Sequence, residues 1–166
     1  MAEISLSRLG RSAKKAVIGS VNAAGDTAES IVEASRDLLL VTLDGVTQVA
    51  VAAEKGAAQI VAGAIGAAVE IGADVGLTIK SAVRGTVKGA SEVGADVSQV
   101  ALKATEGAIQ AAGDLGEDVS EATKQAVTGA IEAADEIGTD ASKAVRNVLT
   151  TSIDGAKDVI KEPFQK

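Results

Sequence analysis

Four aspartates spaced by 22 residues form the most regular set of ionisable side chains in the sequence: Asp74, Asp96, Asp118 and Asp140. Two carboxylates held close together can work as an acid and base pair. A helix rises about 1.5 Å per residue, so neighbouring aspartates in one helix would stand about 33 Å apart. They are too distant to act on one substrate, and we expect them to be solvated or paired between chains.

Other chemistry is also poorly supported. The sequence contains no His and no Cys, the side chains that most often bind zinc or act as activated nucleophiles. We therefore expect a protein that is not an enzyme, with no catalytic residues, no metal site, no cofactor and no small-molecule substrate.

The aspartates belong to a repeated five-residue phrase, which reads IGADV, VGADV, LGEDV and IGTDA from residues 71, 93, 115 and 137. Twenty-two is twice eleven, and eleven residues complete three α-helical turns at about 3.67 residues per turn. In this eleven-residue frame one helix face is apolar and the other is charged, which is the pattern of an amphipathic helix. The repeat therefore predicts a very long helix.

The frame extends back toward the N-terminus, and the single proline, Pro163, lies near the C-terminus. We predict a basic amphipathic N-terminal helix over 1–26, one continuous hendecad helix over 27–162, and a tail over 163–166. Gly25 with Asp26 and Glu29 matches a helix stop followed by a capping box. Gly25 is equally well interpreted as one more glycine tolerated inside a helix.

Large and small residues alternate along the borders of the apolar face. Within each repeat, bulky residues recur every fourth position and form one ridge, and a groove of small residues separates it from the next ridge. Where helices meet, the ridges of one pack into the grooves of the other. We predict a self-association face made of Ile71, Val75, Ile79, Val83, Val87, Val93, Val97, Ile109, Leu115, Val119, Val127, Ile131 and Ile137. The glycines predicted to allow close packing in its grooves are Gly72, Gly94, Gly116 and Gly138.

A second series of glycines, Gly63, Gly85, Gly107 and Gly129, also recurs every 22 residues. These positions are either close-approach sites for a neighbouring helix or merely small. The apolar stripe is wider than the seam of a two-stranded coiled coil. We therefore expect an all-α, nearly straight to slightly right-handed hendecad coiled coil, as a homo-oligomeric bundle of about four helices.

Charge and hydropathy narrow the choice of partners. The net charge of −7 and the pI near 4.6 argue against nucleic acid, and no run of about 18 apolar residues is present to span a membrane. The beginning of the chain lacks a signal-peptide core, so we expect a cytoplasmic protein, with peripheral membrane association as an alternative. The basic residues Arg8, Arg11, Lys14 and Lys15 would make the lipid contact.

The eleven-residue pattern over residues 27–160 resembles that of bacterial hendecad coiled-coil proteins. The segment ALKATEGAI at 101–109 is similar to the lipid-binding repeats of synucleins and perilipins, and the composition resembles that of late-embryogenesis-abundant proteins and phasins. The first resemblance implies a structural protein that associates with itself into a rod or filament. The others imply a coat on an anionic membrane or hydrophobic granule, or a stress protectant.

Overall fold

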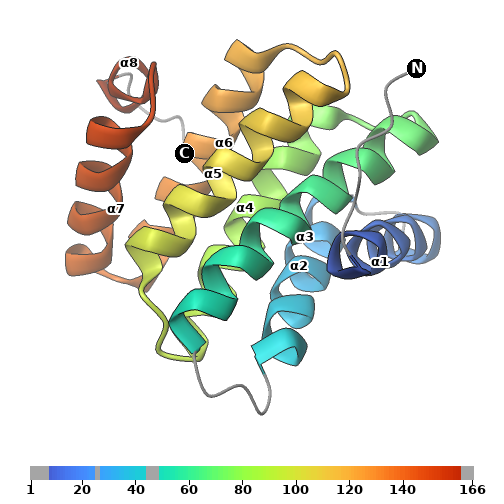
Figure 1. The fold of residues 1–166 in the computed structure, drawn as a ribbon, viewed down its shortest axis with the longest axis horizontal. Helices are drawn as coiled ribbons and strands as arrows, with labels where there is room; N and C mark the ends of the chain where they lie inside the picture. The colour runs from blue at the N-terminus through green and yellow to red at the C-terminus, as the bar shows by residue number, and fades with distance from the viewer. Residues whose placement is uncertain (1–7, 25–26, 44–48, 162–166) are drawn as a thin grey trace.

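The computed structural model describes residues 8–24, 27–43 and 49–161. These residues form α-helices joined by turns, without a strand among them, so the all-α prediction is confirmed. The helices are shown in Figure 1. In chain order they are α1 (Arg8–Ala24), α2 (Thr27–Leu43), α3 (Val49–Ile71), α4 (Val75–Glu92), α5 (Val97–Asp114), α6 (Val119–Ile137), α7 (Thr139–Ser152) and α8 (Ala156–Lys161).

The prediction of one continuous helix over 27–162, and with it that of a long hendecad coiled coil, is wrong. Gly72, Gly94 and Gly116 have φ angles of 70°, 73° and 74°, the left-handed conformation in which glycine commonly ends a helix. Each turn is closed by the same type of backbone hydrogen bond, such as Ala95 N–H to the Ala90 carbonyl at 2.9 Å. The repeated phrase is therefore a turn that reverses the chain direction.

The aspartate of the phrase begins the next helix. Asp74 accepts a hydrogen bond from the backbone N–H of Leu77, Asp96 from that of Ser98 and Asp118 from that of Glu121. Such N-caps satisfy amide groups that have no partner inside the helix. Asp140 is the exception: it lies inside the first turn of α7, whose N-cap is Gly138.

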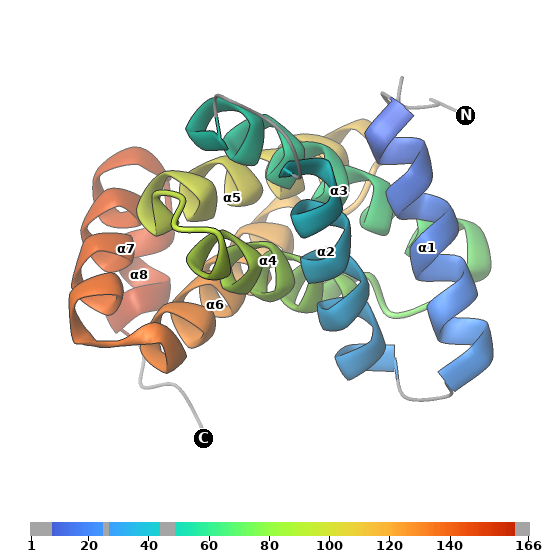
Figure 2. The same ribbon diagram turned by 90° about the horizontal axis from the view of Figure 1, so that it is seen from below.

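The helices of the described residues form two layers. The odd-numbered helices pack in the order α1, α3, α5, α7, the even-numbered helices pack in the order α2, α4, α6, α8, and consecutive helices join the layers (Figure 2). One 22-residue unit is thus one helix with its turn, and two units make a 44-residue antiparallel hairpin. The fold is a helical array in which each helix contacts only near neighbours.

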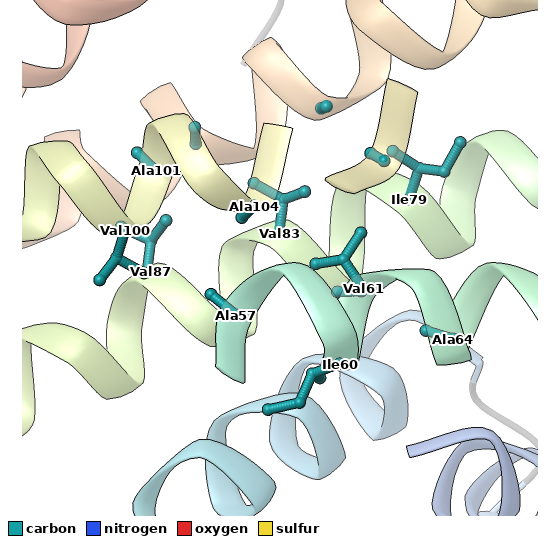
Figure 3. Close-up of a cluster of buried hydrophobic side chains, with 14 of the residues drawn as sticks. Ala57, Ile60, Val61, Ala64, Ile79, Val83, Val87, Val100, Ala101 and Ala104 are labelled. Atoms are coloured by element: carbon teal, nitrogen blue, oxygen red, sulfur yellow. The ribbon is translucent and has the colours of Figure 1, made fainter. Parts of the chain in front are cut away.

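The core lies between the layers and is built from Ala, Val and Ile side chains. Figure 3 shows Val61 of α3, Val83 of α4, and Val100 and Ala104 of α5 on one side of α3, and Ile60 of α3 pointing toward the blue helix on its other side. All five side chains are fully buried. Because alanine predominates, neighbouring helix axes can approach closely without aromatic side chains to fill the space between them.

Glycines set the contact between helices of one layer. A methyl group on Gly63, Gly85, Gly107 or Gly129 would lie within 3.0 Å of a backbone carbonyl oxygen of the facing helix. These four glycines, left open between two interpretations above, are therefore close-approach sites. The facing residue is 53 positions earlier for the first two glycines and 49 earlier for the last two, so the packing register shifts by one helical turn along the array.

The domain boundary predicted after residue 26 falls in the gap between Ala24, the end of α1, and Thr27, the start of α2. Gly25 and Asp26 lie outside the described residues, as does the predicted tail over 163–166. What was predicted as one domain over 27–162 is a series of separate helices, because the Gly and Asp turn recurs inside it.

Candidate functional site

The predicted self-association face is mostly occupied by the chain's own helices. Ile79, Val83, Val87, Val127 and Ile131 are at most 1 % exposed. Six others are partly buried against the core, namely Val75, Val93, Val97, Ile109, Leu115 and Ile137. Ile71 and Val119 are 37 % and 42 % exposed and flank turns. The apolar stripe expected to hold other chains in a bundle is thus mostly covered within one chain.

The glycines predicted to line the grooves have a different role. Gly72, Gly94, Gly116 and Gly138 all have positive φ angles, and no described atom lies within 4 Å of a methyl group placed on any of them. They do not pack against a neighbouring helix, and the prediction of close packing at these four positions is wrong. They are needed for backbone conformation, because other residues enter the left-handed region only at a cost.

The four cations predicted to contact lipid lie on α1. Arg8, Arg11 and Lys15 are exposed, whereas the Lys14 ammonium pairs with the Glu70 carboxylate of α3 at 3.2 Å. The apolar side of the helix is used within the fold, since Ala13 and Val17 are 0 % and 1 % exposed. The outer side of α1 is therefore a basic surface with little apolar area to insert into a bilayer.

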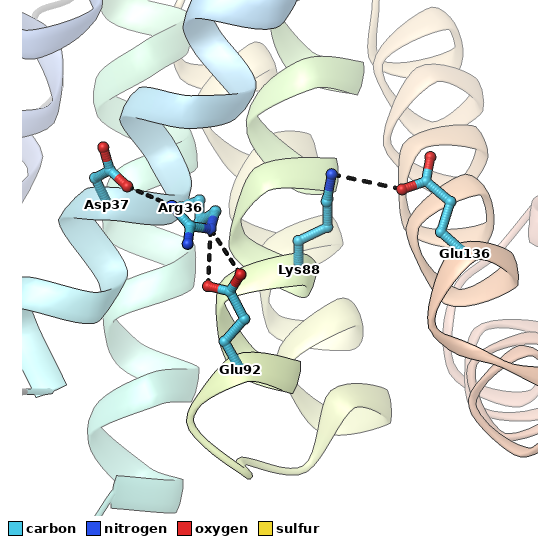
Figure 4. Close-up of polar contacts among 5 residues, drawn as sticks. All are labelled: Arg36, Asp37, Lys88, Glu92 and Glu136. Carbon is cyan, nitrogen blue, oxygen red and sulfur yellow. Dashed lines mark hydrogen bonds and ion pairs between the residues drawn. The ribbon is translucent and has the colours of Figure 1, made fainter.

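Ion pairs connect the helices of the even layer (Figure 4). Arg36 of α2 pairs with Glu92 of α4 at 2.7 Å, and Lys88 of α4 pairs with Glu136 of α6 at 3.5 Å. The hydrogen bond to Glu92 raises the pKa of Arg36 above its ordinary value, and the nearby carboxylates add to this effect. Such half-exposed pairs set the register between helices more than they add stability.

No group of three or more Asp or Glu side chains in residues 8–24, 27–43 and 49–161 is arranged to hold a metal ion. The hydrogen bond from the Ser98 hydroxyl lowers the pKa of Asp96; desolvation opposes this effect, and hydrogen bonds from the backbone amides of Gln99 and Ser98 lower the pKa further. The shift comes from the contacts that Asp96 makes at the start of α5. In the same part of the chain, no helix is long and apolar enough to cross a membrane.

The surface that stands out is the N-terminal end of the array, beside α1 and α2 (Figure 2). Val41 of α2 is 73 % exposed, the most exposed large apolar side chain described. Gly19 of α1 is exposed, and no described atom lies within 4 Å of a methyl group placed on it. We define the N-terminal end face by Arg8, Lys15 and Gly19 of α1 and by Glu29, Glu33, Asp37 and Val41 of α2.

Gly19 lies 44 residues before Gly63, which lies 44 before Gly107. In α3 and α5 this position meets the backbone of the preceding helix of the layer, but α1 begins the layer and the position stays open. Val41 stands at the same position of the 22-residue unit, 44 residues before Gly85. Sequence reasoning missed both residues, although the spacing of the glycines would have located them once the unit was understood as a single helix.

The sequence matches no protein-family model and no curated protein. Among solved structures, the chain is similar to the crystal structure of a de novo designed helical repeat protein, with 20 % sequence identity and a TM-score of 0.46. The similarity covers 92 % of this chain and 88 % of the designed protein.

Proposed function

We propose that this chain is a non-catalytic helical-array protein that works by associating with itself through the N-terminal end face. The observation that carries the proposal is the open Gly19 position. At the equivalent glycines of the later helices, Gly63, Gly85, Gly107 and Gly129, the backbone of a neighbouring helix packs against the glycine. At the end of the array the same packing surface is presented without a described helix on it.

The exposure of Val41 supports the same assignment. A valine side chain that is 73 % exposed gains about 1 to 2 kcal/mol if it is covered by another molecule. The opposite end of the array has no such side chain: no large apolar residue described on α7 or α8 is exposed, and the exposed residues of α7 include Lys143, Asn147 and Thr150. Polar outer faces are typical of capped ends in repeat proteins, which leaves the N-terminal end as the surface suited to a partner.

A protein partner fits this face better than an anionic membrane does. The cations of α1 would be attracted to lipid, but Glu29, Glu33 and Asp37 lie exposed on the neighbouring helix α2 and would be repelled. The apolar side of α1 is buried against the rest of the fold. The lipid-coat alternative therefore has only the charges of α1 in its favour.

Sedimentation velocity of the full chain, from about 1 µM to about 1 mM, tests the proposal, because this range covers free energies of about −8 to −4 kcal/mol. We expect a monomer that converts to a discrete oligomer as concentration rises. Val41→Glu should abolish the conversion and leave the helical circular dichroism unchanged. Val69→Glu is the matched control, because Val69 is also exposed but lies on α3, and it should associate normally.

A second variant separates association from folding. Gly19→Ala should stabilise the monomer by up to about 1 kcal/mol, because alanine favours a helix over glycine, and yet weaken the oligomer by filling the open position. The proposal fails if the chain stays monomeric throughout, or if Val41→Glu and Val69→Glu behave alike. Binding to anionic vesicles by a chain that remains monomeric would support the coat function instead.

A further inference from the structure

The two helices of the N-terminal end face carry opposite charges. Helix α1 contains four basic and no acidic residues, and Arg8 and Lys15 are exposed. Helix α2 places Glu29, Glu33 and Asp37 on its exposed side at four-residue intervals. One helix of the face is thus a positive stripe and its neighbour is a negative stripe.

Neither Lys15 nor Glu33 is within 4.0 Å of an oppositely charged group in the described part of the chain. Asp37, by contrast, already accepts a hydrogen bond from Arg36 at 2.7 Å. Lys15 and Glu33 are therefore charges of this face that are available to a second molecule.

Two-fold symmetry can bring two such faces together in two ways, depending on the direction of the axis in the interface plane. An axis perpendicular to the helices places α1 against α1 of the second copy, with like charges opposed. An axis parallel to the helices places α1 against α2 of the second copy, and α2 against α1. Only the second arrangement matches positive stripes with negative stripes, and it does so twice.

We infer that the oligomer of the proposed function, on which this inference rests, is a two-fold dimer in which each α1 packs antiparallel to α2 of the other copy. Lys15 is nine residues before the end of α1, and Glu33 is six residues after the start of α2. With the end of α1 level with the start of the second copy's α2, the two positions differ by three residues, about 4.5 Å along the helix axis. A lysine side chain can span this distance.

The same alignment accounts for the other residues of the face. Gly19 is five residues before the end of α1 and Glu29 is two residues after the start of α2, so the open glycine faces the first turns of the second copy's α2. Val41 comes to the level of Arg8, whose aliphatic stem can cover it. Each copy supplies both halves of the contact, so the dimer is closed and cannot extend into a filament.

Charge reversal with rescue tests this arrangement in the full chain. Lys15→Glu and Glu33→Lys should each weaken the dimer about tenfold, because each places like charges together at two symmetric contacts. The double variant Lys15→Glu/Glu33→Lys restores opposite charges at both contacts and should dimerise within about threefold of the original chain. Lys143→Glu, an exposed lysine of α7, is the matched control and should have no effect.

The outcomes separate this inference from the function on which it depends. A dimer sensitive to Val41→Glu but indifferent to both charge reversals would retain the proposed function and overturn the two-fold arrangement. Single reversals that are not rescued by the double variant would overturn it as well. A chain that never dimerises would overturn both, and species larger than a dimer would contradict the closed symmetry.

Discussion

Glycine has two separate roles in this chain, and the sequence distinguishes them only by position within the 22-residue unit. Gly94 and its equivalents adopt positive φ angles at turns, and Gly85 and its equivalents bring two helices together in their middle. Both series were recognised as periodic, but the close-packing role was assigned to the turn series. Periodicity places a glycine on a helix face without showing whether its backbone or its missing side chain matters.

Alanine substitution should distinguish the two roles by the size of the loss in unfolding free energy. Gly85→Ala places a methyl group against the Val32 carbonyl and should cost about 2 to 4 kcal/mol, as an overpacked backbone contact must open. Gly94→Ala meets no neighbouring atom and should cost about 1 to 2 kcal/mol from the left-handed backbone alone. Urea denaturation of the two variants measures both values, and equal losses would contradict the assignment.

The N-cap at Asp96 makes stability depend on pH in the acid range. Its pKa is lowered in the folded state, so the ionised carboxylate contributes stability above its ordinary pKa of 3.8, and this contribution is lost as pH falls toward the folded value. At neutral pH, Asp96→Ala should cost about 1 kcal/mol. The loss should be smaller at pH 3.

Asp140 provides the control for this prediction, because it lies within α7 and makes no cap hydrogen bond. Asp140→Ala should cost only about 0.3 to 0.5 kcal/mol, from the lost interaction with the helix dipole. A loss at Asp140 as large as that at Asp96 would show that general helix electrostatics, and not capping, sets the effect.

At the scale of elements, the sequence predicts helix nearly everywhere and places the apolar face correctly, but it conceals the turns. About 18 helical residues and a short turn together make 22, so the apolar pattern resumes in phase after each reversal. A hendecad helix and a hairpin array therefore share one periodicity. The distinguishing signal is local: Gly followed two residues later by Asp is a helix stop followed by a helix start.

Insertions of different length should separate these two architectures. Duplicating residues 75–118 adds 44 residues, one complete hairpin, and should give a folded chain with unchanged helical signal per residue and a higher melting temperature. Duplicating residues 86–118 adds 33 residues, which preserves an eleven-residue helix phase but interrupts the helix and turn unit. We expect this second chain to lose cooperative thermal unfolding, and equal behaviour of the two would contradict the array.

For the whole molecule, bulky residues of the predicted self-association face, such as Val83 and Val127, are buried inside the chain. The sequence could not show this, because identical repeats pack equally well within one chain or between chains. The candidate site on α1 and α2 was predicted only through its basic residues. Its apolar and acidic parts became evident once α1 was seen to begin a layer.

One unit builds both layers, and this governs the shape of the array. Within each half, the glycine contacts of the odd and the even layer have the same residue offset, so the two layers are packed alike. Superhelical curvature in repeat proteins arises when each repeat adds a small rotation, and it produces a concave surface. The two layers are built alike, so we expect little such curvature. Successive helices of a layer are instead rotated relative to one another: α1 is seen nearly end-on in Figure 1, whereas α3 and α5 lie across the view. The array therefore twists along its length, and recognition is left to its ends.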